Sequence, residues 1–434
     1  MASPSSPAVE IRESAEGFIL LHHGEKIYLN GAAIDDATAL PNVRQLDHAI
    51  RFDHLKRAGG NAARLKADKQ VLDEAHKRGI AGVVDLILEG ERDGMDWNND
   101  AQVQAQAERA LALVRELKDH PALLMWIIGN ELDYIPPDEP YNPRIWERLD
   151  ELAVAIKAID PKHPVLTIVG SSQFETKIKE ITEKAPHLDL LGLNGYGELG
   201  KIAGLTHAHF PKPYIITEWG PTGHWEVART TWGAPIEETS SEKAAAIHAR
   251  YRDVVLADKQ RCLGSFLFYW ADKQETTHTW YGLYCEDQMT EGMDTMAHFW
   301  TGQSPANQAP RVKALTVDGS TDKTNLVLKP GQACEAALAA SDPDGDTLTY
   351  TWDIRPEVVI PDGNYAGRKE KRSPILEGLT KGNGAKASFT VPEKEGAYRL
   401  FVTVRDGKGS IGYANFPFYV SATGELPEAT KRYL

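Results

Sequence analysis

The sequence predicts an α/β protein, in which a (β/α)8 TIM barrel is followed by a small all-β sandwich of the immunoglobulin-like kind. Three observations support this prediction. Apolar segments of strand length alternate with segments of helical periodicity from residue 17 to residue 302. Beyond residue 310 the pattern changes to short alternating runs separated by turn signals. Two of the apolar segments in the first region end in a glutamate, Glu131 and Glu218.

Eight apolar segments in the first region are predicted as strands, and helix-like segments lie between them. Eight βα units in fewer than 300 residues match a TIM barrel, whose usual size is about 250 residues. A doubly wound open sheet is the alternative, but no GxGxxG motif follows an early strand. The predicted strands are 25–30, 61–65, 80–88, 122–128, 164–169, 188–193, 213–217 and 263–269, and the clearest helices are 46–58, 69–78, 101–118, 144–159 and 241–257.

The second region is predicted as a β-sandwich of about a hundred residues. Alternating runs at 348–353, 387–391 and 398–404 are separated by turns such as Asp344-Gly345 and Asp406-Gly407. The proline- and glycine-rich stretch 354–384 is expected to form a long excursion from it. The predicted division is a flexible leader (1–16), the barrel (17–302), a polar linker with two prolines (303–310), the sandwich (311–423) and a tail (424–434).

The composition limits the class of partner. The formal net charge is −14 at pH 7, which argues against nucleic acid or an anionic membrane as the main partner, because both require a basic surface. No stretch is long and apolar enough for a transmembrane helix, and the first residues show no signal peptide. We expect a carbohydrate as the partner, and the sequence does not indicate an oligomeric state.

The two glutamates carry the functional prediction. Each ends an apolar segment that is typical of a buried parallel strand. A residue at this position lies at the carboxyl end of a barrel, where such folds build their active sites. Two carboxylates at one barrel mouth are the groups that hydrolyse a glycosidic bond, one as nucleophile and one as acid/base. No catalytic metal or cofactor is expected.

The residues around these glutamates resemble a known family. Gly129-Asn130-Glu131 and Thr217-Glu218-Trp219-Gly220 are similar to the active-site motifs of clan A retaining glycoside hydrolases. Two further segments, 24–31 and 59–64, resemble the TIM-barrel domain of family 2 glycosidases. The resemblance covers nearly all of residues 17–302. Family 2 enzymes carry sandwich domains ahead of the barrel, whereas the sandwich predicted here comes after it.

The resemblance implies roles for single residues. It makes Glu131 the acid/base and Glu218 the nucleophile, and it implies that Asn130 binds the sugar 2-hydroxyl. Arg64, at the end of the second strand, is expected to support the nucleophile, with a structural ion pair as the alternative.

Further residues are expected at the substrate. The resemblance implies that Tyr196 bonds the nucleophile and that Trp270 forms the floor of the sugar subsite, although both could instead be core aromatics. Asn194, two residues before Tyr196, is expected beside them. Sugar rings stack on aromatic surfaces, so we also expect contacts from residues in loops after strands, namely His224, Trp225 and Trp280.

The leading hypothesis is a retaining β-glycosidase that hydrolyses β-linked glucan or a related oligosaccharide or polysaccharide by double displacement. The alternative is a β-glucanosyltransferase, that is, a transglycosylase on the same scaffold. A carbohydrate-binding protein without catalysis is the third hypothesis, and the two intact glutamates argue against it.

The second region resembles the cadherin-like and PKD-type immunoglobulin-fold modules of secreted bacterial proteins. The segments that carry this likeness are 341–352 and 396–406. Asp342, Asp344 and Asp346 are candidates for a structural calcium site, since calcium prefers several oxygen ligands, but a plain turn rich in Asp and Gly is the favoured interpretation. Modules of this type favour a secreted or periplasmic location.

Overall fold

The computed structural model describes residues 9–34, 47–135, 140–358 and 370–427. Their contacts group into two compact units. Of the described residues, 9–34, 47–219 and 249–270 belong to the first unit, and 220–248 and 271–427 belong to the second, each with the gaps just given. The predicted boundary at residue 302 separates the chain differently, and it stays a prediction.

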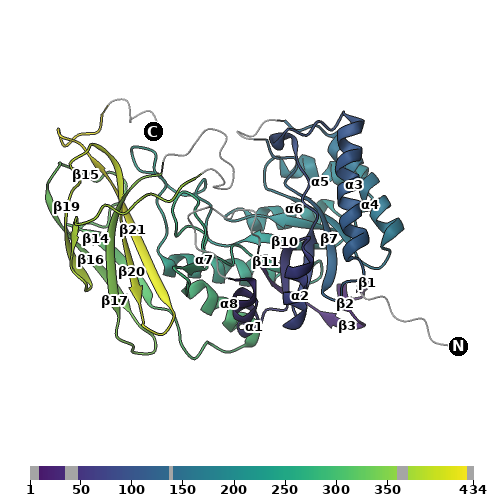
Figure 1. Ribbon diagram of the computed structural model, residues 1–434, viewed down its shortest axis with the longest axis horizontal. Helices are drawn as coiled ribbons and strands as arrows, with labels where there is room; N and C mark the ends of the chain where they lie inside the picture. Colours follow the sequence, from purple (N-terminus) through teal and green to yellow (C-terminus); the bar gives the residue numbers. More distant parts are fainter. Residues whose placement is uncertain (1–8, 35–46, 136–139, 359–369, 428–434) are drawn as a thin grey trace. The chain divides into compact units, whose positions relative to one another are not determined.

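The first unit contains a closed barrel of eight parallel strands (Figure 1), which confirms the predicted barrel. The strands follow one another around the barrel in chain order, and β11 closes against β4. They are β4 (Leu29–Ala33), β5 (Ala62–Lys66), β6 (Ala81–Asp85), β7 (Leu123–Asn130), β8 (Val165–Val169), β9 (Leu190–Asn194), β10 (Tyr214–Trp219) and β11 (Cys262–Leu267).

A small antiparallel sheet covers the amino-terminal end of this barrel. It consists of β1 (Val9–Ser14), β2 (Gly17–His22) and β3 (Glu25–Ile27). Val9 and Leu20 from this sheet share one buried apolar cluster with the first residues of several barrel strands, including Leu29, Ala62 and Leu190. Because apolar burial holds this end closed, the opposite, carboxyl end remains for a functional site.

Helices alternate with the barrel strands as the periodicity predicts. Side-chain caps precede several of them: Asp47 accepts a hydrogen bond from the amide of Ala49, Asp68 accepts from those of Gln70 and Val71, and Asn99 accepts from those of Ala101 and Gln102. The helices are α1 (His48–Arg57), α2 (Lys69–Lys77), α3 (Asp100–Leu117), α4 (Arg144–Ile159), α5 (Phe174–Lys184), α6 (Leu199–His209), α7 (Ser240–Arg250) and α8 (Glu291–Thr301), with a 3-10 turn η1 (Glu91–Asp93) and a π-turn η2 (Tyr251–Val255). Among the described residues, none of the helices combines the length and apolarity needed to cross a bilayer.

Two predicted strands have different bounds in the structure. The segment predicted at 25–30 contains both β3 and the start of β4, because the chain passes directly from the small sheet into the barrel. The strand predicted at 80–88 ends at Asp85, whose carboxylate accepts a hydrogen bond of 2.9 Å from the Ile87 amide. Ile87 has a φ of +49°, which breaks the extended conformation.

The second unit contains two four-stranded sheets that share one apolar core (Figure 1). Buried residues from both sheets, such as Leu315, Phe389, Leu400 and Phe416, meet in this core. The all-β region is therefore confirmed, while its immunoglobulin-like identity stays a prediction. One sheet has the order β14 (Arg311–Val317), β16 (Ala333–Ser341), β19 (Lys386–Thr390), β18 (Thr380–Lys381), the other β15 (Val327–Leu328), β21 (Ile411–Val420), β20 (Gly396–Arg405), β17 (Thr349–Pro356), and a short hairpin β12 (Tyr284–Cys285) and β13 (Gln288–Met289) lies in the same unit.

The segment predicted as a linker is fixed by hydrogen bonds within the second unit. The amide of Ala309 donates to Asp294 of α8 at 2.6 Å, and the side chain of Asn307 donates to Asp406 at 2.7 Å. Burial raises the pKa of Asp294 to about 7, although the Ala309 amide and Arg311 act to lower it. The Asp294 carboxylate therefore ionises in the neutral range, inside the joint between α8 and the sandwich.

This joint predicts a pH dependence of stability. The pKa of Asp294 lies above its ordinary value of 3.8 in the folded protein, so ionisation costs folding free energy as the pH rises from about 4 to about 7. Asparagine resembles the protonated acid. We expect Asp294→Asn to increase the free energy of unfolding at pH 8 by about 1 to 2 kcal/mol more than at pH 5. Thermal and urea unfolding at both pH values measure the difference.

Glu16→Gln is the matched control, because it removes the same charge from an exposed turn. It should show no such change between the two pH values. A gain of equal size for both variants would mean that net charge, and not the buried carboxyl, causes the effect.

Candidate active site

Glu131 and Glu218 lie at the carboxyl ends of two barrel strands, as predicted. Glu131 directly follows β7, and Glu218 is the next-to-last residue of β10. The strand pairing shifts register just before each of them, between Ile127 and Asn130 in β7 and between Ile216 and Glu218 in β10. Bulges of this kind redirect side chains and are frequent next to active sites.

The backbone around Glu131 has an unusual conformation. Gly129 has a φ of +93° and Glu131 itself a φ of +49°; the second value is uncommon for a residue with a side chain. Gly170, after β8, leaves room for the carboxylate, because a Cβ at that position would lie 3.0 Å from Glu131 Oε1. Strained residues that the surroundings hold in place are a feature of functional sites.

Arg92 in η1 holds this strained segment. Its Nη1 donates to the carbonyl oxygen of Glu131 at 2.6 Å, and its Nη2 donates to that of Asn130 at 3.0 Å. The sequence analysis did not identify Arg92, since an arginine between two acidic residues in a loop is common. Only the fold brings it to the end of β7.

Glu218 contacts a buried arginine. Arg64 of β5 donates to Glu218 Oε1 at 2.7 Å and, through its other terminal nitrogen, to Asp85 Oδ2 at 3.2 Å. The Tyr196 hydroxyl lies 3.5 Å from Glu218 Oε2, at the limit of hydrogen bonding. The structure thus brings Arg64 and Tyr196 to Glu218, where the sequence predicted them.

Asn194 connects the two glutamates through the strands between them. Its Nδ2 donates to Glu131 Oε1 at 2.7 Å and to Asn130 Oδ1 at 3.0 Å. Its Oδ1 accepts from the Thr217 hydroxyl at 2.8 Å, one residue before Glu218. This single amide on β9 therefore fixes side chains of both β7 and β10.

Trp270 has a different environment from the one predicted. It follows β11, is fully buried, and donates from its indole nitrogen to the carbonyl of Arg51 at 3.2 Å. It therefore exposes no ring face among the described residues. Its role as a sugar floor stays a prediction.

The remaining predicted residues belong to the second unit and lie in loops after β10 and β11. His224 contacts Glu275 Oε1 through Nε2 at 3.0 Å, and Lys273 contacts Glu275 Oε2 at 2.7 Å. Burial acts to raise the pKa of Glu275, but Lys273 and His224 outweigh it, so that the pKa falls to about 2. Trp280 is buried against His224, whereas Trp225 is 50% exposed.

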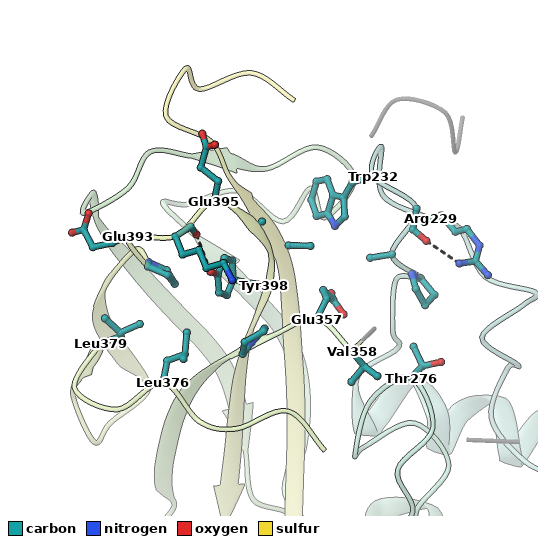
Figure 2. Close-up of a pocket in the computed structure, with 18 of the residues that line it drawn as sticks. Arg229, Trp232, Thr276, Glu357, Val358, Leu376, Leu379, Glu393, Glu395 and Tyr398 are labelled. Atoms are coloured by element: carbon teal, nitrogen blue, oxygen red, sulfur yellow. Dashed lines mark hydrogen bonds between the residues drawn. The ribbon is translucent and has the colours of Figure 1, made fainter. Parts of the chain in front are cut away.

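A cavity in the second unit has a volume of about 1100 Å³ and is lined by none of the residues placed at the substrate in the sequence analysis (Figure 2). Its aromatic residues, Trp232 and Tyr398, are only 7% and 5% exposed, so neither offers a face for a sugar ring. The Tyr398 hydroxyl donates to the carbonyl of Lys394 at 2.8 Å. We place no substrate in this cavity.

An aspartate cluster lies near the predicted calcium site. Oxygens of Asp342, Asp346 and Asp406 lie within 4.8 Å of one another. Asp344, which was also predicted, instead accepts a hydrogen bond from the amide of Gln308 at 2.7 Å. Lys408 contacts Asp346 at 2.6 Å.

Comparison with known proteins identifies relatives of the barrel region. Residues 70–281 match the family model described as "Glycosyl hydrolases family 2, TIM barrel domain". A beta-glucuronidase of Felis catus is 27% identical over 154 residues, which are 33% of this chain and 21% of that protein. Nearly half of the chain is therefore similar to the barrel domain of a glycoside hydrolase family.

Solved structures show the same fold. A calcium binding mutant of Bacteroides uniformis beta-glucuronidase 2 has a TM-score of 0.51 at 16% identity, over 95% of this chain and 48% of that one. A beta-glucuronidase of an uncultured Clostridium species has a TM-score of 0.51 at 15% identity, over 68% of this chain and 54% of that one. The chain spans about half the length of these structures.

Proposed function

We propose that this protein is a retaining β-glycosidase in which Glu218 is the nucleophile and Glu131 the acid/base. The observation that carries the proposal is the ion pair between Glu218 and Arg64. Glu218 receives a hydrogen bond from the guanidinium of Arg64, whereas Glu131 receives one from the neutral amide of Asn194. A cationic partner stabilises the negative charge of a nucleophile. A neutral partner suits a carboxyl group that gains and loses a proton during the cycle.

The reaction then proceeds in two displacements. A carboxylate oxygen of Glu218 attacks the anomeric carbon while Glu131 donates its proton to the departing glycosidic oxygen. The resulting glycosyl ester on Glu218 is hydrolysed by a water whose proton returns to Glu131. Asn130 and Asn194 lie beside Glu131, and their amides are suited to bind sugar hydroxyls.

The substrate is part of the proposal. We expect a β-linked glucan or a related oligosaccharide, from the sequence analysis. The relatives are beta-glucuronidases by name, which adds β-glucuronides to the substrates that a test must include. A transglycosylase is the second candidate, because the exposed Trp225 suits a sugar acceptor. A secreted or periplasmic location is proposed with this function.

The proposal predicts the effect of Glu218→Ala. We expect kcat to fall on the order of 10⁴-fold or more, because the nucleophile is lost. Azide should restore turnover of an activated β-glycoside and give the α-glycosyl azide, since azide then attacks in place of Glu218 from the same face. Product analysis by mass spectrometry and NMR, across a panel of β-glucans, β-glucuronides and aryl β-glycosides, measures both. Glu147→Ala, an exposed glutamate on α4, is the matched control and should keep full activity.

Comparable activity of Glu218→Ala and the wild type would overturn the nucleophile assignment. In the wild type, products longer than the donor would establish the transglycosylase. The absence of any product across the panel would favour the carbohydrate-binding protein.

Glu131→Ala should have a different effect. We expect it to slow substrates with poor leaving groups about 10²-fold or more relative to activated aryl glycosides, which need little help from a general acid. Azide should here give the β-glycosyl azide, because it enters on the face that water normally uses. Kinetics on paired alkyl and aryl glycosides measure the ratio. Equal losses on both kinds of substrate would contradict the acid/base role.

A structural calcium ion in the second unit is proposed separately. Asp342 Oδ2 and Asp346 Oδ2 are buried without a hydrogen-bond partner, and Asp406 lies within reach. We expect millimolar calcium to stabilise the protein against unfolding by about 2 kcal/mol relative to EDTA, and Asp346→Asn to abolish this gain. Magnesium is the control ion. The same melting temperature in calcium and in EDTA would show that the Lys408 ion pair, and no metal, neutralises the cluster.

A further inference from the structure

A buried carboxylate joins the sandwich to two loops that follow barrel strands. Glu237, in the loop after β10, accepts hydrogen bonds from the Thr277 and Thr279 hydroxyls, both at 2.7 Å, in the loop after β11. It also accepts from Lys243 of α7 and, at 2.6 Å, from Asn415 of β21. All five residues are buried and belong to the second unit.

The hydrogen bonds of Glu237 fix the positions of its partners, because a buried charge is stable only while its donors stay in place. Burial acts to raise the pKa of Glu237, but Lys243 and Arg399 outweigh it, and the pKa lies below its ordinary value. The carboxylate is thus ionised, and it stays so only while its donors are in place. A shift of either loop away from the sandwich would leave an unpaired buried charge.

Arg399 of β20 makes a second connection. It donates to Asn415 Oδ1 at 2.7 Å and to the carbonyl of Pro235 at 3.0 Å, in the loop after β10. Its remaining side is paired with Glu357 at 2.9 Å. One sandwich arginine therefore orients both the asparagine that contacts Glu237 and the backbone next to Glu237.

A third connection comes from the end of the long excursion of the sandwich. Glu370 accepts hydrogen bonds from the Thr276 amide at 2.6 Å and from Gln274 Nε2 at 3.2 Å. Arg372 forms an ion pair with Asp272 at 3.0 Å. Glu370 and Arg372 are thus bound to residues 272–276 of the loop after β11.

The loops held in this way continue two of the strands that carry predicted site residues. The part of each loop that belongs to the second unit begins at Gly220, two residues after Glu218, and at Ala271, directly after Trp270. In (β/α)8 enzymes the loops at the carboxyl ends of the strands build the substrate site. Their conformation therefore bears on substrate binding.

We propose that the sandwich is a positioning domain for the loops after β10 and β11, and that Asn415, Arg399 and Glu370 are its positioning residues. This inference rests on the proposed glycosidase function. It differs from the usual expectation for an appended sandwich, which is a separable module that binds polysaccharide or acts as a spacer. A separable module does not need buried, charged contacts with loops of the catalytic barrel.

Asn415→Ala tests the proposal in the full-length protein. The substitution removes the Asn415 side-chain amide, which donates a hydrogen bond to Glu237 and accepts one from Arg399. It leaves every residue of the candidate active site unchanged. Its matched control is Phe389→Leu, a core change in β19 of the other sheet, which destabilises the sandwich without touching the loops. Both variants are measured at 25 °C, after unfolding curves show them folded at that temperature.

The proposal expects kcat/KM on the best substrate of the wild type to fall about 10- to 100-fold in Asn415→Ala, as for a misplaced binding loop, with little change in Phe389→Leu. Hydrogen exchange followed by mass spectrometry should show faster exchange of residues 221–238 and 271–281 in Asn415→Ala only. Unchanged kinetics and exchange in Asn415→Ala would overturn the proposal. Equal effects in both variants would also overturn it, because general destabilisation would then explain them.

Glu370→Ala is the second test if Asn415→Ala does not fold. The hydrogen bonds of Glu370 described above go only to residues 274 and 276. Faster exchange confined to that loop supports the proposal, and unchanged exchange overturns it. The exchange measurement needs no substrate. A wild type without activity on any glycoside would therefore contradict the proposed function while the positioning role is still tested.

Discussion

The site depends on Arg64, which contacts two carboxylates at once. Asp85, Glu131 and Glu218 end three strands of one barrel, and like charges at one mouth repel one another. Arg64 is buried and donates to Glu218 and to Asp85 from its two terminal nitrogens. A planar guanidinium provides this forked geometry, which a lysine could not reproduce. Because one cation contacts side chains of both β6 and β10, it holds Glu218, the proposed nucleophile, in a fixed position.

Asn194 performs the complementary task for Glu131. Its amide accepts from Thr217 and donates to Asn130 and Glu131, so a residue of β9 orients Glu131, the proposed acid/base. The backbone of Glu131 is held from the other side by Arg92. The two glutamates are therefore fixed by separate groups, and each set of partners matches the charge that its glutamate carries in the proposed reaction.

The sequence was informative where the determinants are local. An apolar strand that ends in a glutamate is visible in the chain, and so are the barrel and the pair Glu131 and Glu218. The expectation that Arg64 and Tyr196 contact Glu218 came from the family resemblance. Arg92 and Gly170 could not be identified, because their roles depend on which loop the barrel brings to the end of β7 and β8. Helix and strand patterns likewise do not show that residues 220–248 and 271–301 associate with the sandwich, since that association rests on long-range pairs such as Glu237 with Asn415.

These long-range pairs bear on the role of the second region. If a flexible linker joined the sandwich to the barrel, the loops after β10 and β11 would have no fixed conformation. Ordering them would then cost conformational entropy each time a ligand bound. Here Asn307 and Ala309 fix the connecting segment, and Glu237 fixes the loops to β21. A buried ionised group stabilises a fold poorly compared with an apolar one, but it tolerates far fewer alternative arrangements. In the proposed positioning role, the sandwich therefore restricts the conformation of the loops more than it adds stability, and the proposed two-carboxylate mechanism requires such fixed positions of the groups around it.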